Sequence, residues 1–280
     1  MPAEARTGRA RRLVWAVAVV VVSLLFLLPL LAMVGGSLRP QGLPPPRDIE
    51  LFPPDPSLGA YRTAFAIAPL ARSVLNSLLV AAISVPIAVL SASWGGFALA
   101  QLDGRARRRV FVFLLLVLMV PVSAVWLTRF AIFKNAGLTD TYVPLIAPAV
   151  MGGSPLFVLL YWLAFRRIPG DIVSAARLEG AGPWRVWRSV AMPLVRSTTI
   201  AVGLLAFALS WANFIDALLY LSTEELYTAP LVLRSLEQLG QTNWPVILSG
   251  AAVVTLPVAV TFAMALRFVV PRKGAGWLGG

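Results

Sequence analysis

Six apolar runs, each about twenty residues long, dominate this sequence and restrict what it can fold into. A helix needs roughly 20 apolar residues to cross the hydrocarbon core, and lipid offers no hydrogen-bond partner to an unpaired backbone amide. None of the runs alternates with the period of two that marks a membrane β-strand. Only 13% of the 280 residues are charged, which is too few to cover a soluble surface.

The sequence therefore predicts an all-α integral membrane protein, with a single transmembrane domain over residues 1–280. We place its six transmembrane helices at about residues 13–34, 73–100, 110–130, 143–165, 199–221 and 246–270.

Clusters of basic residues predict the orientation of these helices, because Lys and Arg beside a span stay on the cytoplasmic side. The clusters precede the first span, separate spans two and three, separate spans four and five, and follow the sixth. Their members are Arg6, Arg9, Arg11, Arg12, Arg105, Arg107, Arg108, Arg109, Arg166, Arg167, Arg177, Arg185, Arg188, Arg196, Arg267, Arg272 and Lys273. Both termini are thus predicted to be cytoplasmic, in a multi-pass protein of the cell membrane. The net charge of +12 follows from this topology and from attraction to anionic lipid head groups, so it does not indicate a nucleic acid partner.

The residue types that most catalytic and metal sites need are missing from the sequence. It holds no cysteine and no histidine, which excludes disulfides, Cys or His metal ligands, and a Cys or His catalytic centre. Its twelve acidic residues lie mainly in loops, without a pair at readable spacing. We predict neither a catalytic site nor a metal site.

A polar segment at residues 166–198 separates the fourth and fifth apolar runs on the cytoplasmic side. Asp171 is placed to cap a helix that begins near Ile172. Gly180 and Gly182 end that helix, and Pro183 suits the first position of a second one. Both helices are too short and too polar to span a membrane. Three interpretations are open: an amphipathic loop on the inner leaflet, a helix-turn-helix DNA reader, and a docking surface for a cytosolic partner.

At this segment the chain resembles the permease subunits of binding-protein-dependent ABC importers, in their carbohydrate (maltose-type) branch. The family pattern is Glu-Ala-Ala, three residues, Gly, nine residues, then Ile-x-Leu-Pro. Here Ala175 and Ala176 are followed by Gly180 and, after nine residues, by VAMP ending at Pro193. Ser174 departs from the usual Glu, while Glu179 stands where the carbohydrate branch usually has Asp.

Further motifs in the expected order carry the same resemblance from about Leu75 to Arg272. NSLLVAAIS, which begins at Asn76, and GGFALAQLDGRARR are similar to the start and the end of the family's second span. RRIPGDIVSAA is similar to the approach to the cytoplasmic loop, and SWANFIDALLYLS to the family's fifth span.

The resemblance implies that the segment forms a coupling helix, which sits in a groove of a cytosolic ATPase and transmits its closure to the permease as alternating access. The implied coupling residues are Ser174, Ala175, Ala176, Glu179, Gly180, Ala181, Gly182 and Pro193. No GxxxxGK[ST] motif occurs, so this chain is expected to bind no cofactor, and ATP with Mg belongs to the ATPase. The implied partners are a second permease that forms a heterodimer, two ATPases, an extracytoplasmic solute-binding protein and membrane lipid. The tail GAGWLGG stands where relatives reach the ATPases, with a disordered tail as the alternative.

Polar residues in and near the spans are candidates for the translocation pathway. Ser210, Asn213 and Asp216 follow one another at intervals of three, and an ionisable residue near a span is a functional candidate. Asn76 and Trp211 join this set, because sugars need hydroxyl-matching hydrogen bonds and an apolar stacking surface. Helix packing, or solvation of Asp216 at the outer end, is the alternative. In the third outer loop, the resemblance implies binding-protein contacts at Glu224, Glu225, Gln238 and Asn243, where a merely solvated loop is the alternative.

The function expected from these features is ATP-driven import of a sugar or related polyol by a non-catalytic permease. An ion-gradient-driven secondary transporter or channel is the competing interpretation. Such a carrier normally places ionisable residues at the middle of its spans, and these spans hold almost none.

Overall fold

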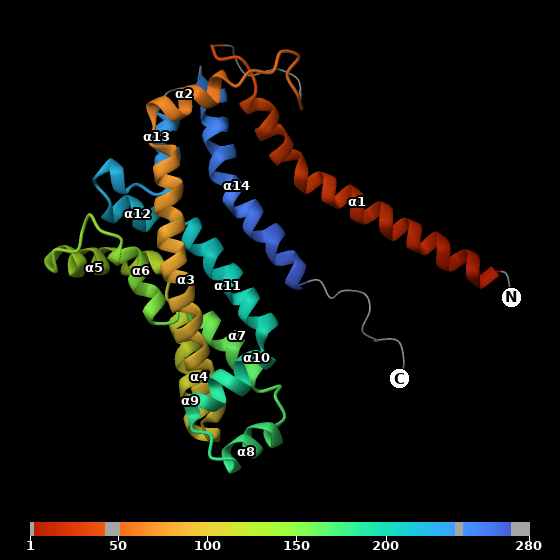
Figure 1. Ribbon diagram of the computed structural model, residues 1–280, viewed down its shortest axis with the longest axis vertical. Coiled ribbons are helices and arrows are strands. Elements are labelled where there is room, and N and C mark those ends of the chain that lie inside the picture. The colour runs from red at the N-terminus through yellow and green to blue at the C-terminus, as the bar shows by residue number, and fades with distance from the viewer. Residues whose placement is uncertain (1–2, 43–50, 239–242, 270–280) are drawn as a thin grey trace. The chain divides into compact units, whose positions relative to one another are not determined.

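Helices make up the regular structure of this chain, in a computed structural model that describes residues 3–42, 51–238 and 243–269 (Figure 1). No strand occurs within those three ranges. Four helices there are long and apolar enough to cross a membrane, and the number rises to six if each of two sharply bent helix pairs is one span. The all-α membrane fold is confirmed.

The four long candidates cover the first, second, fourth and sixth apolar runs. The first, second and sixth runs form α1 (Ala3–Ser37), α3 (Leu70–Gln101) and α14 (Trp244–Val269). The fourth run is divided into α6 (Val143–Val150) and α7 (Pro155–Phe165). Gly152 and Gly153 have positive φ between these two helices, and the Ser154 hydroxyl then caps α7 by accepting the Leu156 amide at 3.3 Å.

The third apolar run, where a span was expected at residues 110–130, is not one straight helix. α4 (Gly104–Met119) and α5 (Val122–Asn135) meet at an angle of 88°. Pro121 lies between them. Its ring removes a backbone N–H and pushes Val120 into the extended conformation, with φ −73° and ψ 118°, so the helix cannot continue through this point.

The fifth apolar run, where a span was expected at residues 199–221, is also divided. α11 (Arg196–Trp211) ends ten residues before the expected boundary, and α12 (Phe214–Tyr220) follows it. Asn213 separates the two helices as the N-cap of α12, and its side chain accepts the Asp216 amide. A bend of 86° precedes α11, at Val195.

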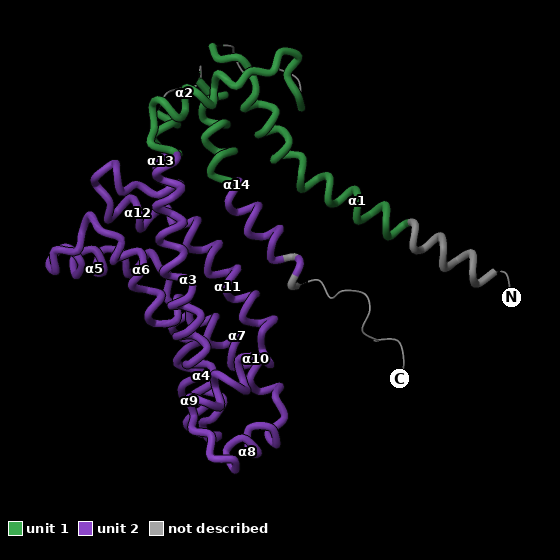
Figure 2. Tube along the Cα trace, in the orientation of Figure 1, with its two compact units in different colours: residues 1–70, 233–255 green, residues 71–232, 256–280 purple. Residues whose placement is uncertain are grey.

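Two compact units divide the described chain (Figure 2). The unit formed by residues 1–70 and 233–255 contains a short helix, α2 (Gly59–Ile67). Its buried face carries Ala60 and Ala64. The Tyr61 hydroxyl bonds the Ser37 hydroxyl at 2.8 Å, and the Ser249 hydroxyl donates to the Ala60 carbonyl at 3.2 Å. These bonds join α2 to the end of α1 and to the first turns of α14.

The second unit contains the largest apolar core. Its buried residues come from α3, α6, α7, α11 and the segment that precedes α11; they are Ala88, Ala92, Phe97, Ala149, Phe157, Tyr161, Phe165, Val186, Trp187, Ala191, Val195, Val202 and Ala206. A smaller cluster of Leu99, Leu159 and Trp162 holds α4 against α3 and α7 through Phe111. The polar segment at residues 166–198 is therefore partly built into this core.

Gly96 allows α3 and α7 to approach each other closely. A Cβ atom at Gly96 would lie 2.8 Å from the Trp162 backbone nitrogen and 2.9 Å from the Val158 carbonyl oxygen. Backbone atoms cannot rotate away as a flexible side chain can. Gly203, inside α11, has no atom within 4 Å of the same position, so the two glycines form a matched pair.

We predict opposite effects when these two glycines are replaced by alanine. Gly96→Ala should lower the free energy of unfolding by about 1–3 kcal/mol, because added volume strains a packed contact. Gly203→Ala should leave it unchanged or raise it by up to about 1 kcal/mol, since alanine is the better helix former. Thermal unfolding of the purified protein in detergent measures both; equal melting temperatures would show that α3 and α7 are not in close contact.

Candidate functional site

The polar segment at residues 166–198, which was expected to be cytoplasmic, contains α8 (Gly170–Leu178), whose end is fixed by Gly180. The amide of Ala181 donates to the carbonyl of Ala176, and the amide of Gly180 donates to the carbonyl of Arg177, both at 3.0 Å. This pair of bonds is a Schellman motif, which needs a left-handed residue at the second position past the last helical residue. Gly180 supplies it with φ 80°. The glycine expected to end the helix therefore also directs the chain into the next one.

The expected cap at Asp171 is wrong. α8 begins at Gly170 with Pro169 as its N-cap, and no side chain accepts a cap hydrogen bond. Asp171 lies in the first turn, where its charge interacts favourably with the helix dipole. The prediction failed because IPGD offers a proline that ends the preceding turn two residues earlier than an aspartate cap would.

The second half of the segment packs into the core. α9 (Pro183–Val186) begins at the predicted proline and continues into η1 (Trp187–Ala191), a π-helical turn in which the Met192 amide donates to the Trp187 carbonyl. α10 (Met192–Leu194) then leads to the bend at Val195. Trp187 is buried, and its ring lies 5.8 Å from Trp94 of α3 and 4.8 Å from Trp184.

α8 differs from this second half, because none of its residues is buried. Val173 and Ala176 rest against the core, and the Arg177 guanidinium donates to the Gln101 side chain at the end of α3. Two other side chains of α8 present apolar atoms to solvent: Leu178 is 90% exposed and Ile172 is 40% exposed. A short helix held on one side, with an exposed leucine, can bind a partner protein.

The eight expected coupling residues differ in their exposure. Ala176 and Ala181 are half-buried against the core. The remaining six are exposed: Ser174, Ala175, Glu179, Gly180, Gly182 and Pro193.

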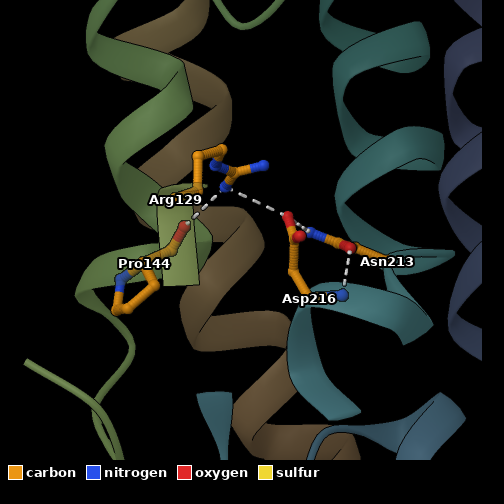
Figure 3. A network of polar contacts seen from close by, with 4 residues as sticks. All are labelled: Arg129, Pro144, Asn213 and Asp216. Carbon is orange, nitrogen blue, oxygen red and sulfur yellow. Dashed lines mark hydrogen bonds and ion pairs between the residues drawn. The ribbon is translucent and has the colours of Figure 1, made fainter. Parts of the chain in front are cut away.

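A polar network inside the membrane domain joins α5, α6 and α12 (Figure 3). The Arg129 guanidinium donates to an Asp216 carboxylate oxygen at 3.3 Å and to the Pro144 carbonyl at 3.4 Å. The Asn213 amide donates to the same carboxylate oxygen at 3.1 Å. The Asp216 side chain is only 10% exposed and that of Arg129 is 22% exposed. The acid that the sequence singled out is therefore paired, and the pair carries no net charge.

Arg129 was missed by the sequence analysis, although a signal for it exists. It is the single charged residue within the apolar run of residues 110–130, and an ionisable residue inside such a run points to a partner or a function. Its partner could not be named, because Asp216 comes 87 residues later and α5 turns sharply away from α4.

The other candidates for the pathway also have partners in this structure. The Asn76 side chain donates to the carbonyls of Glu225 and Tyr227, at 2.8 and 3.0 Å, and thus ties α3 to the third outer loop. The Ser210 hydroxyl bonds the Ser84 hydroxyl at 3.1 Å, and Trp211 is buried beside Phe207. Among the five candidates, only Ser210 and Asn213 have a half-buried side chain and also lie close to the break between α11 and α12.

The residues expected to contact a binding protein are mostly at the surface. Glu224 and Glu225 are exposed in η2 (Glu224–Leu226), Gln238 is exposed after α13 (Ala229–Glu237), and Asn243 is half-buried. The C-terminal tail, which was expected near the ATPases, lies outside the described residues.

Asp140 connects the loop between α5 and α6 to the segment that follows α12. Its carboxylate accepts the amides of Ser222 and Thr223, both at 2.9 Å, and the Thr223 hydroxyl. These bonds favour the charged form and lower the pKa of Asp140 below its usual value. The backbone of Asp140 has φ 60°, a conformation that Asp and Asn tolerate better than most residues.

We predict that the Arg129–Asp216 pair is stabilising only as a pair. Asp216→Leu or Arg129→Met alone should each cost about 3 kcal/mol, because either leaves one charge or its partners unsatisfied at low exposure. The double variant should cost clearly less than the sum of the two. Unfolding free energies in a double-mutant cycle measure this; additive costs would mean that the two side chains do not interact.

We also predict that the Asp140 clamp is sensitive to acid. A lowered pKa means that the clamp is complete above the ordinary value of 3.8 and is lost as the pH falls through the lowered pKa. Hydrogen exchange at the Ser222 and Thr223 amides should accelerate across that range, after correction for intrinsic rates. Asp140→Asn keeps a residue that tolerates the same backbone conformation and should remove the pH-dependent step; an unchanged step would assign it to another group.

Comparison with known proteins agrees with the resemblance seen in the sequence. Residues 63–273 match the family described as "Binding-protein-dependent transport system inner membrane component". The trehalose transport system permease protein SugB of Mycobacterium tuberculosis is 29% identical over 271 residues, which cover 96% of this chain and 98% of that protein. A putative ABC transporter permease protein of Streptomyces antibioticus is 31% identical over 218 residues, covering 77% of this chain and 94% of that protein.

Among solved structures, a chain of a bacterial ABC transporter that imports the acidic polysaccharide alginate has the same fold, with a TM-score of 0.77. It is 18% identical, and the match covers 95% of this chain and 98% of that one. The family match extends over most of the chain and favours an importer permease over an ion-gradient-driven carrier. The chain therefore belongs to the inner membrane components of binding-protein-dependent transport systems, as a multi-pass and non-catalytic permease subunit of the ABC type.

Proposed function

We propose that this permease imports a sugar or related polyol and that a cytosolic ATPase drives it by binding the outward face of α8. The observation that carries the proposal is the contrast within the cytoplasmic segment. α8 has no buried residue, while α9 and η1 contribute Val186, Trp187 and Ala191 to the core. A force on α8 would thus reach α3 and α7 through packed side chains.

The link between α8 and α9 is short, and backbone hydrogen bonds fix its conformation. The Schellman bonds at Gly180 and Ala181 fix the exit from α8, and Pro183 begins α9 two residues later. The Arg177 contact with Gln101 adds a second connection to α3. A displaced α8 therefore carries α9 with it, which a flexible loop would not do.

Glu179 is an exposed carboxylate at the end of α8 and carries part of the role that the family's usual Glu at position 174 would have. It is the C-cap of α8 and lies beside the exposed Leu178. An apolar anchor next to one charge is the composition of a protein-binding hot spot with a polar rim. We assign ATP and Mg to the ATPase partner and none to this chain.

The solute class follows from two kinds of support. The relative from Mycobacterium tuberculosis is named for trehalose and the structural match for alginate, so both are named for carbohydrates. The fifth apolar run of this chain provides neutral hydrogen-bonding groups at Ser210 and Asn213, beside an ion pair without net charge. We propose that these two residues contact the solute, while Asn76, Trp211 and Asp216 hold the surrounding structure in place.

The assembly proposed is two different permeases, two ATPases and an extracytoplasmic solute-binding protein, with both termini of this chain in the cytoplasm. Glu224, Glu225 and Gln238 supply exposed polar groups for the binding protein. Asn243 is half-buried and is expected to contribute less.

Leu178→Ser tests the docking surface. The side chain is 90% exposed, so its loss should change the stability of this chain by no more than about 0.5 kcal/mol, whereas an interface anchor is worth 2 kcal/mol or more, about thirtyfold in affinity. Co-purification of the ATPase and transport should fall together.

The matched control is Leu58→Ser, which removes a 62% exposed leucine at the start of α2. It should leave ATPase binding unchanged. Full ATPase retention and full transport in Leu178→Ser would refute docking on this face of α8.

A further inference from the structure

One face of α4 combines three arginines with an apolar stripe. It borders a surface cavity of about 490 Å³, lined by Arg105, Arg108, Arg109, Val112, Phe113 and Leu116. These positions follow the three- and four-residue spacing that puts side chains on one side of a helix. All six side chains are exposed. The cavity therefore has a cationic end and an apolar end.

The cationic end lacks a counter-charge within the described part of the chain. Arg105, Arg108 and Arg109 form no ion pair there, and Asp103, the acid next to them in sequence, accepts the Ala106 amide as the N-cap of α4. Three guanidinium groups within about one turn repel one another, and guanidinium forks bind phosphate oxygens well. An anion would relieve this repulsion.

The apolar end determines what kind of anion fits. Leu116 lies seven residues beyond Arg109, so at 1.5 Å per residue the apolar stripe ends about 10 Å along α4 from the arginines. A free phosphate would use only the arginines and leave this stripe bare. A phospholipid with an anionic head group would use both ends, with its phosphate at the arginines and an acyl chain along Val112, Phe113 and Leu116.

We propose that this face of α4 is a binding site for one anionic phospholipid. The topology rule alone requires only that basic residues follow the second span, and RARRR would satisfy it on any face. The structure is more specific. Arg107 belongs to the same cluster but is half-buried and does not line the cavity.

Arg107 therefore provides a matched control for the experiment. The assembled transporter, purified in detergent, is titrated with phosphatidylglycerol, and bound lipid is counted by native mass spectrometry. Arg108→Gln should weaken binding about fivefold, which corresponds to about 1 kcal/mol per basic residue near an anionic group. Arg107→Gln removes the same charge and should change binding less than twofold, while Arg108→Lys should keep most of it.

Two further arms identify the ligand. Phosphatidylcholine should bind at least tenfold more weakly than phosphatidylglycerol. Phe113→Ser should weaken phosphatidylglycerol binding, and millimolar inorganic phosphate should not compete for the site. Melting temperatures and membrane insertion of all variants verify that they fold.

Three results would overturn the proposal. Equal losses of phosphatidylglycerol binding in Arg107→Gln and Arg108→Gln would show that binding depends only on net charge. Competition by inorganic phosphate together with an unchanged Phe113→Ser would leave a simple anion site. If this face of α4 cross-links to another subunit and binds no lipid, it is a protein interface and not a lipid site. None of these results depends on whether α8 binds the ATPase.

Discussion

The need to satisfy backbone hydrogen bonds in lipid governs how this chain departs from straight helices. At three of the interruptions, a residue at the break reduces the number of backbone groups left without a hydrogen bond. Pro121 contributes no N–H, and its carbonyl accepts the Ala124 amide at 3.0 Å. Ser154 caps α7 and Asn213 caps α12 through side-chain oxygens. Breaks therefore occur where such a residue is available, and polar side chains are present at these places for a structural reason.

Asn213 shows how one cap organises a larger site. Its oxygen accepts the Asp216 amide, and its nitrogen donates to the Asp216 carboxylate, which in turn pairs with Arg129. The break between α11 and α12 thus places Asn213 where it bonds Asp216, and the bend after α4 places Arg129 near the same carboxylate. The resulting ion pair carries no net charge.

The sequence predicted the helical membrane fold, the order of the apolar runs, and the glycine and proline that shape the cytoplasmic segment, because these follow from local backbone chemistry. It did not predict the Arg129 pair, the Asp140 clamp or the partners of Asn76, since each joins residues far apart in the chain. It placed the N-cap of α8 at Asp171, two residues after the actual N-cap Pro169, because several residues near it can end the preceding turn. Long-range pairing depends on how the bent helices pack, which local patterns do not specify.

The proposed coupling of an ATPase to this permease requires that α8 be a cytoplasmic surface that the ATPase covers. The natural chain has no cysteine, so Ser174→Cys, at an exposed position on α8, adds one nearly isosteric thiol to an otherwise unreactive protein. Reaction with a membrane-impermeant maleimide measures its accessibility. The predicted result is no labelling in intact cells, labelling in inside-out vesicles that lack the ATPase, and protection when the ATPase is bound. Labelling from outside the cell, or equal labelling with and without the ATPase, would contradict it.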